Sequence, residues 1–117
     1  MTGVDRRDGA VVLSLAGELD LYNAEEVRSA LLDACAGEPD LLVVDLEHVR
    51  FIDSTALGVL IGAVKRLRSR DGRLTIVNVD DNIAKTFEIT GLDQIFPISP
   101  TRDEAVKALD AEEAASN

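Results

Sequence analysis

The chain has 117 residues, 46% of them hydrophobic, which is enough for one folded domain with a single core. Its 22 acidic and 12 basic residues give a net charge of −10, which argues against a nucleic acid or an anionic lipid surface as the main partner. A single cysteine excludes an internal disulfide, and the sequence contains neither a signal peptide nor an apolar run of about 20 residues. We therefore expect a soluble, cytoplasmic protein.

The first half of the chain predicts a hairpin, a helix and a buried strand. The pair Asp8–Gly9 precedes a β-branched run and predicts a tight turn between two short strands. GELDLYN then forms a connection, in which Asn23, followed three residues later by Glu26, is typical of a capped helix start. That helix is expected to stop near Gly37. The apolar run LLVVDL, residues 41–46, predicts a strand covered on both faces.

The middle of the chain predicts a long helix and another strand. The stretch FIDSTALGVLIG, residues 51–62, leads from the previous strand into a helix that ends before Asp71–Gly72. LTIVNV, residues 74–79, predicts the next strand. The inward face of the helix is expected to carry apolar residues at helical spacing: Leu57, Leu60, Ile61, Val64 and Leu67.

The last third of the chain predicts two short helices around an edge strand. The first helix ends at Gly91. Residues 95–99 form a strand that Pro97 restricts to the edge of the sheet. Thr101 and Glu104 form a second capping box, and residues 111–117 are expected to be a frayed tail. The inward residues of the two helices are predicted to be Ile83, Ala84 and Phe87, then Ala105, Val106 and Leu109.

The predicted order of elements is β-β-α-β-α-β-α-β-α. Strands that alternate with helices imply parallel crossover connections, and the first hairpin adds an antiparallel pair. The sequence therefore predicts an α/β fold in which a mixed β-sheet, made of an N-terminal hairpin plus parallel βαβ units, is covered by about four helices. Residues 1–117 are expected to form one domain.

The residues needed for enzyme chemistry are scarce. The chain has one histidine, His48, read as a loop residue, and no cluster of Cys and His that could hold a metal ion. Ser54 lacks the Gly-x-Ser-x-Gly context of a hydrolase nucleophile, because Ile52 stands where the first glycine would be. No glycine-rich phosphate loop is present. We therefore expect no enzyme, no catalytic residue, no metal and no cofactor.

Two further features have ordinary structural interpretations. Cys35 follows Leu31 by four residues, which indicates a thiol near the buried face of its helix. Gly58 and Gly62 are one turn apart and are expected to let their helix pack closely on the sheet.

Asp53, Ser54 and Thr55 stand where a strand gives way to a helix. Each residue type is a favoured N-cap, so all three have a structural explanation. The other interpretation is that a hydroxyl at that place is a site where the protein is modified. The residues alone leave both interpretations open.

The segment VVDLEHVRFIDSTALGVLIGAVKRLRSRDGRLTIVNV, residues 43–79, closely resembles the STAS family, the domain of sulfate transporters and of anti-sigma factor antagonists. The likeness continues through GELD (residues 17–20) and ITGLDQIF (residues 89–96). It extends over nearly the whole chain and is strongest to the small stand-alone bacterial antagonists. The resemblance therefore implies the STAS fold and the function of an anti-sigma factor antagonist.

In the family that this chain resembles, the serine after the aspartate is phosphorylated by an anti-sigma factor that is also a serine-protein kinase and that binds the ATP. The resemblance makes Ser54 the phosphoacceptor and places Asp20, Asp53, Ser54, Thr55 and Gly58 on the partner-binding surface. The unphosphorylated protein would bind the anti-sigma factor and release a sigma factor. A PP2C-like phosphatase would reverse the modification. The chain departs from the family at Ala56, where glycine is common, which puts the efficiency of the kinase in doubt.

A helix N-terminus tolerates a phosphate, so the modification would act at the interface and leave the fold intact. A partner that packed an apolar or acidic surface over Ser54 would be expelled by desolvation and like-charge repulsion. The alternative function is an accessory STAS subunit of a membrane lipid or anion transport complex, without direct binding to the membrane. A scaffold in a signalling assembly and a hydrolase using Ser54 are the remaining alternatives.

Overall fold

The computed structural model describes residues 3–7, 10–36, 41–95 and 97–107. The expected turn at Asp8–Gly9, the helix stop at Gly37, the inward position of Leu109 and the tail at 111–117 lie outside these residues.

Five strands form one sheet in the order β1-β2-β3-β4-β5. The first strand, β1 (Gly3–Arg7), pairs antiparallel with β2 (Ala10–Leu19), as the predicted hairpin requires. Parallel pairs then join β2 to β3 (Leu41–Ile52), β3 to β4 (Arg73–Val77), and β4 to β5 (Ile98–Ser99). The mixed sheet is therefore confirmed, and β5 lies at its edge.

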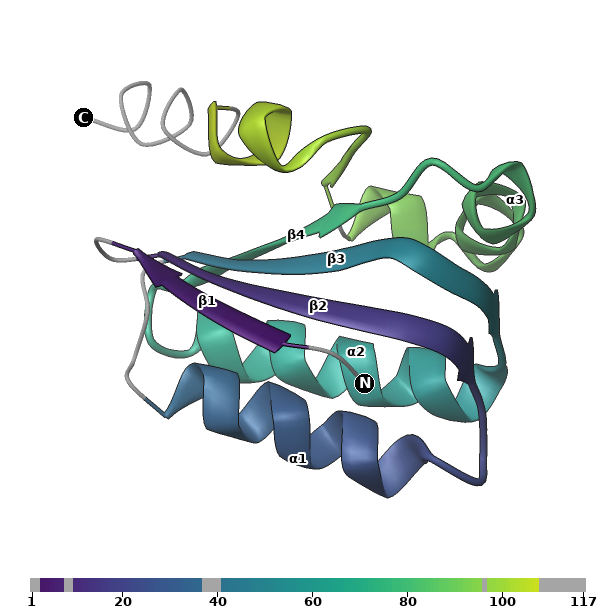
Figure 1. Cartoon of the computed structure of the whole chain (residues 1–117), viewed down its shortest axis with the longest axis horizontal. Helices are drawn as coiled ribbons and strands as arrows, with labels where there is room; N and C mark the ends of the chain where they lie inside the picture. Colours follow the sequence, from purple (N-terminus) through teal and green to yellow (C-terminus); the bar gives the residue numbers. More distant parts are fainter. Residues whose placement is uncertain (1–2, 8–9, 37–40, 96, 108–117) are drawn as a thin grey trace.

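The helices follow the predicted order. They are α1 (Ala24–Cys35), α2 (Ser54–Arg68) and α3 (Asp81–Thr90), followed by a 3-10 turn, η1 (Leu92–Gln94). Residues 102–107 are also helical. Figure 1 shows α1 and α2 side by side beneath one face of the sheet, with residues 102–107 toward the other face. This arrangement confirms the predicted α/β fold with about four helices.

The main core lies between the sheet and the pair α1 and α2. Alternate residues of the two central strands, such as Leu13 and Leu15 in β2 and Leu42 and Val44 in β3, point toward these helices and are buried. A smaller cluster occupies the opposite face, where Ala105 packs among strand residues. Because β3 is covered on both faces, its first six residues are all buried, as the run LLVVDL predicts.

The two central strands are longer than the apolar runs that predict them. β2 extends to Leu19, so Gly17 to Leu19 belong to the strand and not to a connection. β3 continues to Ile52, which places His48 in a strand and not in a loop. The register between the strands shifts at Gly17, whose φ of 84° is a conformation that glycine adopts without strain.

Two predictions about helix residues are wrong. Asn23 is the N-cap of α1, but its side chain makes no cap hydrogen bond. Instead, its Oδ1 accepts from Asp20 N, and its Nδ2 donates to Glu18 O at the end of β2. Ala84 is exposed, because only Ile83 and Phe87 of α3 are buried.

The glycine pair of α2 does not face the sheet. Gly58 and Gly62 are exposed and line a groove of about 380 Å³ between α1 and α2. A Cβ added at either position would meet no atom within 4 Å. Close packing of the helix on the sheet is therefore not the reason for these glycines.

The segment after β5 is joined to the sheet by a polar network. Asp45, which is almost fully buried in β3, accepts a hydrogen bond from Arg102 Nε at 2.7 Å. Arg102 also donates to the hydroxyl of Ser14 in β2. Thr101 accepts from the backbone N–H of Glu104 at 3.1 Å, as expected of the second capping box. None of the helices in the described ranges is both long and apolar enough to span a membrane.

Candidate functional site

The candidate site lies where the parallel strands end. The carboxyl ends of β2, β3 and β4 meet at one edge of the sheet, and the chain continues from them into α1, α2 and α3. We call this the carboxyl edge. Asp20, Asp53 and Asp80 follow directly or closely after its strands.

Asp53 joins the ends of β2 and β3. It is the N-cap of α2, and its Oδ1 accepts a hydrogen bond from Ala56 N at 3.0 Å. Its Oδ2 accepts from Leu21 N, and its own N–H donates to Leu19 O, each at 3.0 Å. The capping interpretation is therefore correct for Asp53. The same carboxylate also fixes the connection between β2 and α1.

Ser54 and Thr55 are the first two residues of α2, and both are exposed. Gly58, one turn later on the same side of the helix as Ser54, is exposed as well. Ala56, between them, is buried. The Ser54 hydroxyl is thus at the surface, next to helix N–H groups that attract an anion.

Asp20 shapes the neighbouring connection. Its Oδ1 accepts from Tyr22 N at 3.0 Å and from Asn23 N at 3.3 Å, and Asn23 Oδ1 accepts from Asp20 N at 2.8 Å. Leu19 and Leu21, on either side of Asp20, both hydrogen bond to Asp53. The structure therefore brings Asp20 and Asp53 to one place.

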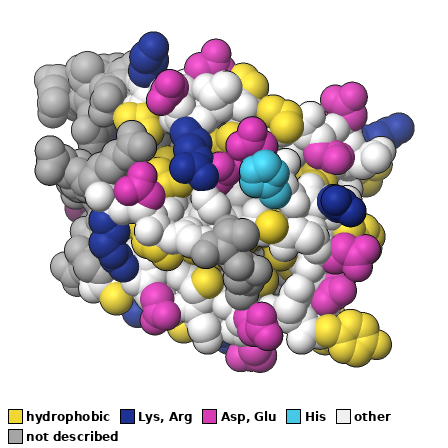
Figure 2. Space-filling model, in the orientation of Figure 1, with side chains coloured by type: hydrophobic (Ala, Val, Ile, Leu, Met, Phe, Trp, Pro, Cys, Tyr) yellow, Lys and Arg dark blue, Asp and Glu magenta, His cyan; other side chains and the backbone are white. Residues whose placement is uncertain are grey.

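Sequence reasoning missed two residues of this edge. Leu21 is 66% exposed and Tyr22 is 95% exposed, although both are large and apolar in part. Phe51 and Val79, near the ends of β3 and β4, are also exposed. Figure 2 shows hydrophobic and acidic side chains together at the corner where Figure 1 places the connection between β2 and α1. The signal in the sequence was an apolar pair inside a polar loop.

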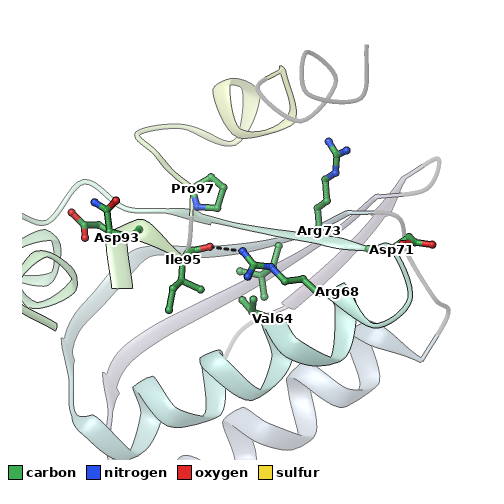
Figure 3. Close-up of a pocket in the computed structure, with 10 residues that line it drawn as sticks. Val64, Arg68, Asp71, Arg73, Asp93, Ile95 and Pro97 are labelled. Atoms are coloured by element: carbon green, nitrogen blue, oxygen red, sulfur yellow. Dashed lines mark hydrogen bonds between the residues drawn. The ribbon is translucent and has the colours of Figure 1, made fainter. Parts of the chain in front are cut away.

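A large cavity lies away from the carboxyl edge. A pocket of about 820 Å³ is formed by the end of α2, the start of β4 and η1 (Figure 3). Arg68 crosses it and donates to Ile95 O at 3.2 Å. Because α2 has 15 residues, this pocket lies about 20 Å from Ser54 along the helix axis. The pocket is therefore separate from the carboxyl edge.

Cys35 is buried at the end of α1, as predicted. Burial raises the pKa of its thiol above the ordinary value of 9.0, and the positive charges of Arg66 and Arg70 oppose that rise. A thiol with a raised pKa is a poor nucleophile at neutral pH. Cys35 is therefore a core residue.

Comparison with known proteins agrees with this geometry. Residues 3–105 match the model of the STAS domain. The anti-sigma-B factor antagonist of Listeria monocytogenes is 38% identical over 100 residues, which cover 86% of this chain and 88% of the relative.

Two solved structures extend the likeness. An anti-sigma factor antagonist from Mycobacterium paratuberculosis superposes with a TM-score of 0.85 at 33% identity and covers 92% of both chains. The Bacillus cell fate determinant SpoIIAA in its phosphorylated form superposes with a TM-score of 0.69 at 25% identity, over 92% of this chain and 97% of the relative. The chain described here therefore belongs to the STAS domain family, which includes these anti-sigma factor antagonists.

Proposed function

We propose that this protein is an anti-sigma factor antagonist. Without a phosphate it binds an anti-sigma factor and so releases a sigma factor; phosphorylation of Ser54 by that partner, acting as a serine-protein kinase with its own ATP, ends the binding. A PP2C-like phosphatase restores the active form. In this function the protein is a non-enzymatic regulator in which residues 1–117 form a single domain.

One observation carries the proposal: Ser54 is exposed at the first position of α2. A kinase can reach this hydroxyl without unfolding the chain, and a partner can pack over it. The solved phosphorylated form of the Bacillus relative supports a phosphate on a protein of this fold.

The geometry supports a switch at the interface. A phosphoserine carries a charge of about −1.5 to −2 and three acceptor oxygens. At the N-terminus of α2 the helix dipole favours that charge, so the isolated domain tolerates it. In a packed contact the phosphate must lose its bound water. Removing water from this charged group costs far more free energy than removing it from a neutral hydroxyl.

The partner-binding residues are part of the proposal. Asp20 and Asp53 hold the two connections in place, while Ser54, Thr55 and Gly58 form the exposed start of α2. We expect these five residues to lie within or directly under the contact with the anti-sigma factor.

The test begins with capture of partners by the wild-type chain, followed by mass analysis of the bound proteins and of Ser54. We expect an anti-sigma factor with a kinase fold, and ATP-dependent phosphate on Ser54 when the two proteins are mixed. Ser54→Ala should bind but resist inactivation, while Ser54→Asp should fold normally and bind poorly. Thr55→Ala, at the next exposed position, is the matched control and should still be inactivated by ATP.

Recovery of a transporter ATPase, with no phosphate on Ser54 after incubation with ATP, would overturn the proposal. That result would favour the alternative, an accessory subunit of a membrane lipid or anion transport complex.

A further inference from the structure

The connection between β2 and α1 presents two apolar side chains in a fixed position. Tyr22 is 95% exposed and Leu21 is 66% exposed. Burying such side chains in a partner is favourable, and aromatic residues are enriched among the residues that dominate binding energy. Burial of this exposed pair in a contact with a partner would therefore lower the free energy relative to leaving it in water.

The backbone under this pair is held at every residue from Asp20 to Asn23. Leu21 N donates to Asp53 Oδ2, and Tyr22 N donates to Asp20 Oδ1, each at 3.0 Å. Asn23 completes the network through Asp20 N at 2.8 Å and Glu18 O at 2.6 Å. A connection that is already ordered loses little entropy on binding. Its rigidity is thus suited to recognition.

The pair lies beside the proposed phosphoacceptor. Asp53, which accepts from Leu21 N, is the residue before Ser54 and caps the same helix. A surface that covers Ser54 therefore lies close to the backbone of Leu21, and Tyr22 is the next residue along the chain.

The segments that form the carboxyl edge are acidic. Three segments at the carboxyl edge, residues 17–26, 51–58 and 77–84, contain no Lys or Arg. The nearest basic residues in the sequence, Arg28, Arg50 and Lys85, lie just outside them. The seven acidic residues of these segments are Glu18, Asp20, Glu25, Glu26, Asp53, Asp80 and Asp81.

From these observations we infer that Leu21 and Tyr22 are the anchor of the interface, and that they enter an apolar pocket rimmed by Lys and Arg side chains on the anti-sigma factor. The inference rests on the proposed function and adds the contact residues and the chemistry of the partner. The apolar pair supplies affinity. The acidic residues of the carboxyl edge attract the basic rim of the partner's pocket, which orients the two proteins and speeds their association.

This surface also bears on how a phosphate would act. A basic rim attracts negative charge, so repulsion by the partner would not explain loss of binding. The phosphate would instead act through its bulk and through the cost of removing its water where the contact is packed.

The test uses the purified anti-sigma factor kinase that the wild-type chain captures, and measures its Kd for each variant by calorimetry. Tyr22→Ala should raise Kd about 30-fold or more and Leu21→Ala about 10-fold. Val4→Ala is the matched control: Val4 is also an exposed apolar residue but pairs with Leu13, about 20 Å along β2 from Leu19. It should stay within about twofold of wild type.

The salt dependence of the affinity tests separately whether charges on the two proteins attract each other. Raising NaCl from 50 to 300 mM should weaken the wild-type complex about tenfold, mainly through slower association. Replacing Glu25 and Glu26 by Gln should reduce that dependence, because both carboxylates lie in the first turn of α1 beside the anchor.

The result that overturns the inference is a Tyr22→Ala variant within about twofold of wild type while Ser54→Asp has lost binding; the proposed function would then stand without this anchor. Affinity that rises with salt would also overturn it. If Tyr22→Ala loses affinity and Ser54→Asp does not, the anchor stands and the phosphorylation switch fails.

Discussion

At the scale of single residues, Asp53 connects the fold to the proposed site. One carboxylate oxygen caps α2 and the other holds Leu21 N. Asp53→Ala removes both bonds and should lower the free energy of unfolding by about 1–2 kcal/mol. Asp53→Asn keeps a good cap but has one acceptor oxygen in place of two, so its loss should be under about 1 kcal/mol. Urea denaturation measures both.

Thr55→Ala is the control for Asp53, since Thr55 is an exposed neighbour, and should stay within about 0.5 kcal/mol of wild type. If Asp53→Ala and Asp53→Asn lowered the free energy of unfolding equally, the helix cap would contribute nothing to stability beyond the bond to Leu21.

Cys35 predicts a pH dependence. Because burial raises its pKa in the folded chain, the unfolded thiol loses its proton first as pH rises through 9.0. The stabilising contribution of the neutral thiol is therefore complete below pH 9.0 and declines above it. We expect the free energy of unfolding to fall more steeply between pH 8 and 10.5 in wild type than in Cys35→Ala. If the free energy of unfolding fell equally with pH in the two proteins, the raised pKa of Cys35 would be contradicted.

At the scale of elements, α2 contains two glycines that its own packing does not need. Gly58 and Gly62 lie inside the helix, and an added Cβ meets nothing within 4 Å. Alanine at either position should stabilise the protein by about 0.5–1 kcal/mol, measured by urea denaturation. Gly62→Ala should leave partner binding unchanged. Gly58→Ala should weaken binding several-fold, because Gly58 is one turn from Ser54 on the proposed surface.

Gly58→Ala and Gly62→Ala each serve as the control for the other, because both replace glycine by alanine in the same helix. Destabilisation by Gly62→Ala would restore the packing role that the sequence suggests. Equal binding by both variants would remove Gly58 from the surface.

The order of elements could be predicted because hydrophobic periodicity and helix signals agree along the chain. Helix α2 shows both, with Asp53 at its start and a regular buried face. The ends of β2 and β3 could not be predicted. Residues 17–19 and 47–51 are largely polar or exposed, and they are strand because each pairs with the other in parallel.

The site was predictable only in part. Asp20, Asp53 and Ser54 follow local patterns, and the structure places them at one edge. The bond from Leu21 to Asp53 joins residues 32 apart in sequence, which no local pattern encodes. The backbone of Tyr22 is held by Asp20, within the same connection. The inward assignment of Ala84 failed because small apolar residues are common on either side of a surface helix.

At the scale of the whole molecule, Arg102 ties the chain after β5 to the centre of the sheet. Its guanidinium is the partner of the buried carboxylate of Asp45. Arg102→Ala leaves that charge without its cation and should cost about 2–4 kcal/mol of unfolding free energy, measured in urea. Adding Asp45→Asn should recover part of the loss, since the buried group is then neutral.

Arg28→Ala is the control for Arg102, because its ion pair with Glu25 is exposed and long at 3.8 Å, and should cost under about 0.5 kcal/mol. A loss for Arg102→Ala no larger than that of Arg28→Ala would mean that water replaces the guanidinium at Asp45.

The central claim is that charging Ser54 ends partner binding and leaves the domain folded. The direct measurement compares the unphosphorylated chain with a preparation fully phosphorylated at Ser54, using one anti-sigma factor kinase and one buffer. We predict that Kd rises about 100-fold or more, while the free energy of unfolding changes by less than about 1 kcal/mol. Equal affinity of the two forms, or loss of affinity only because the phosphorylated chain unfolds, would contradict the claim.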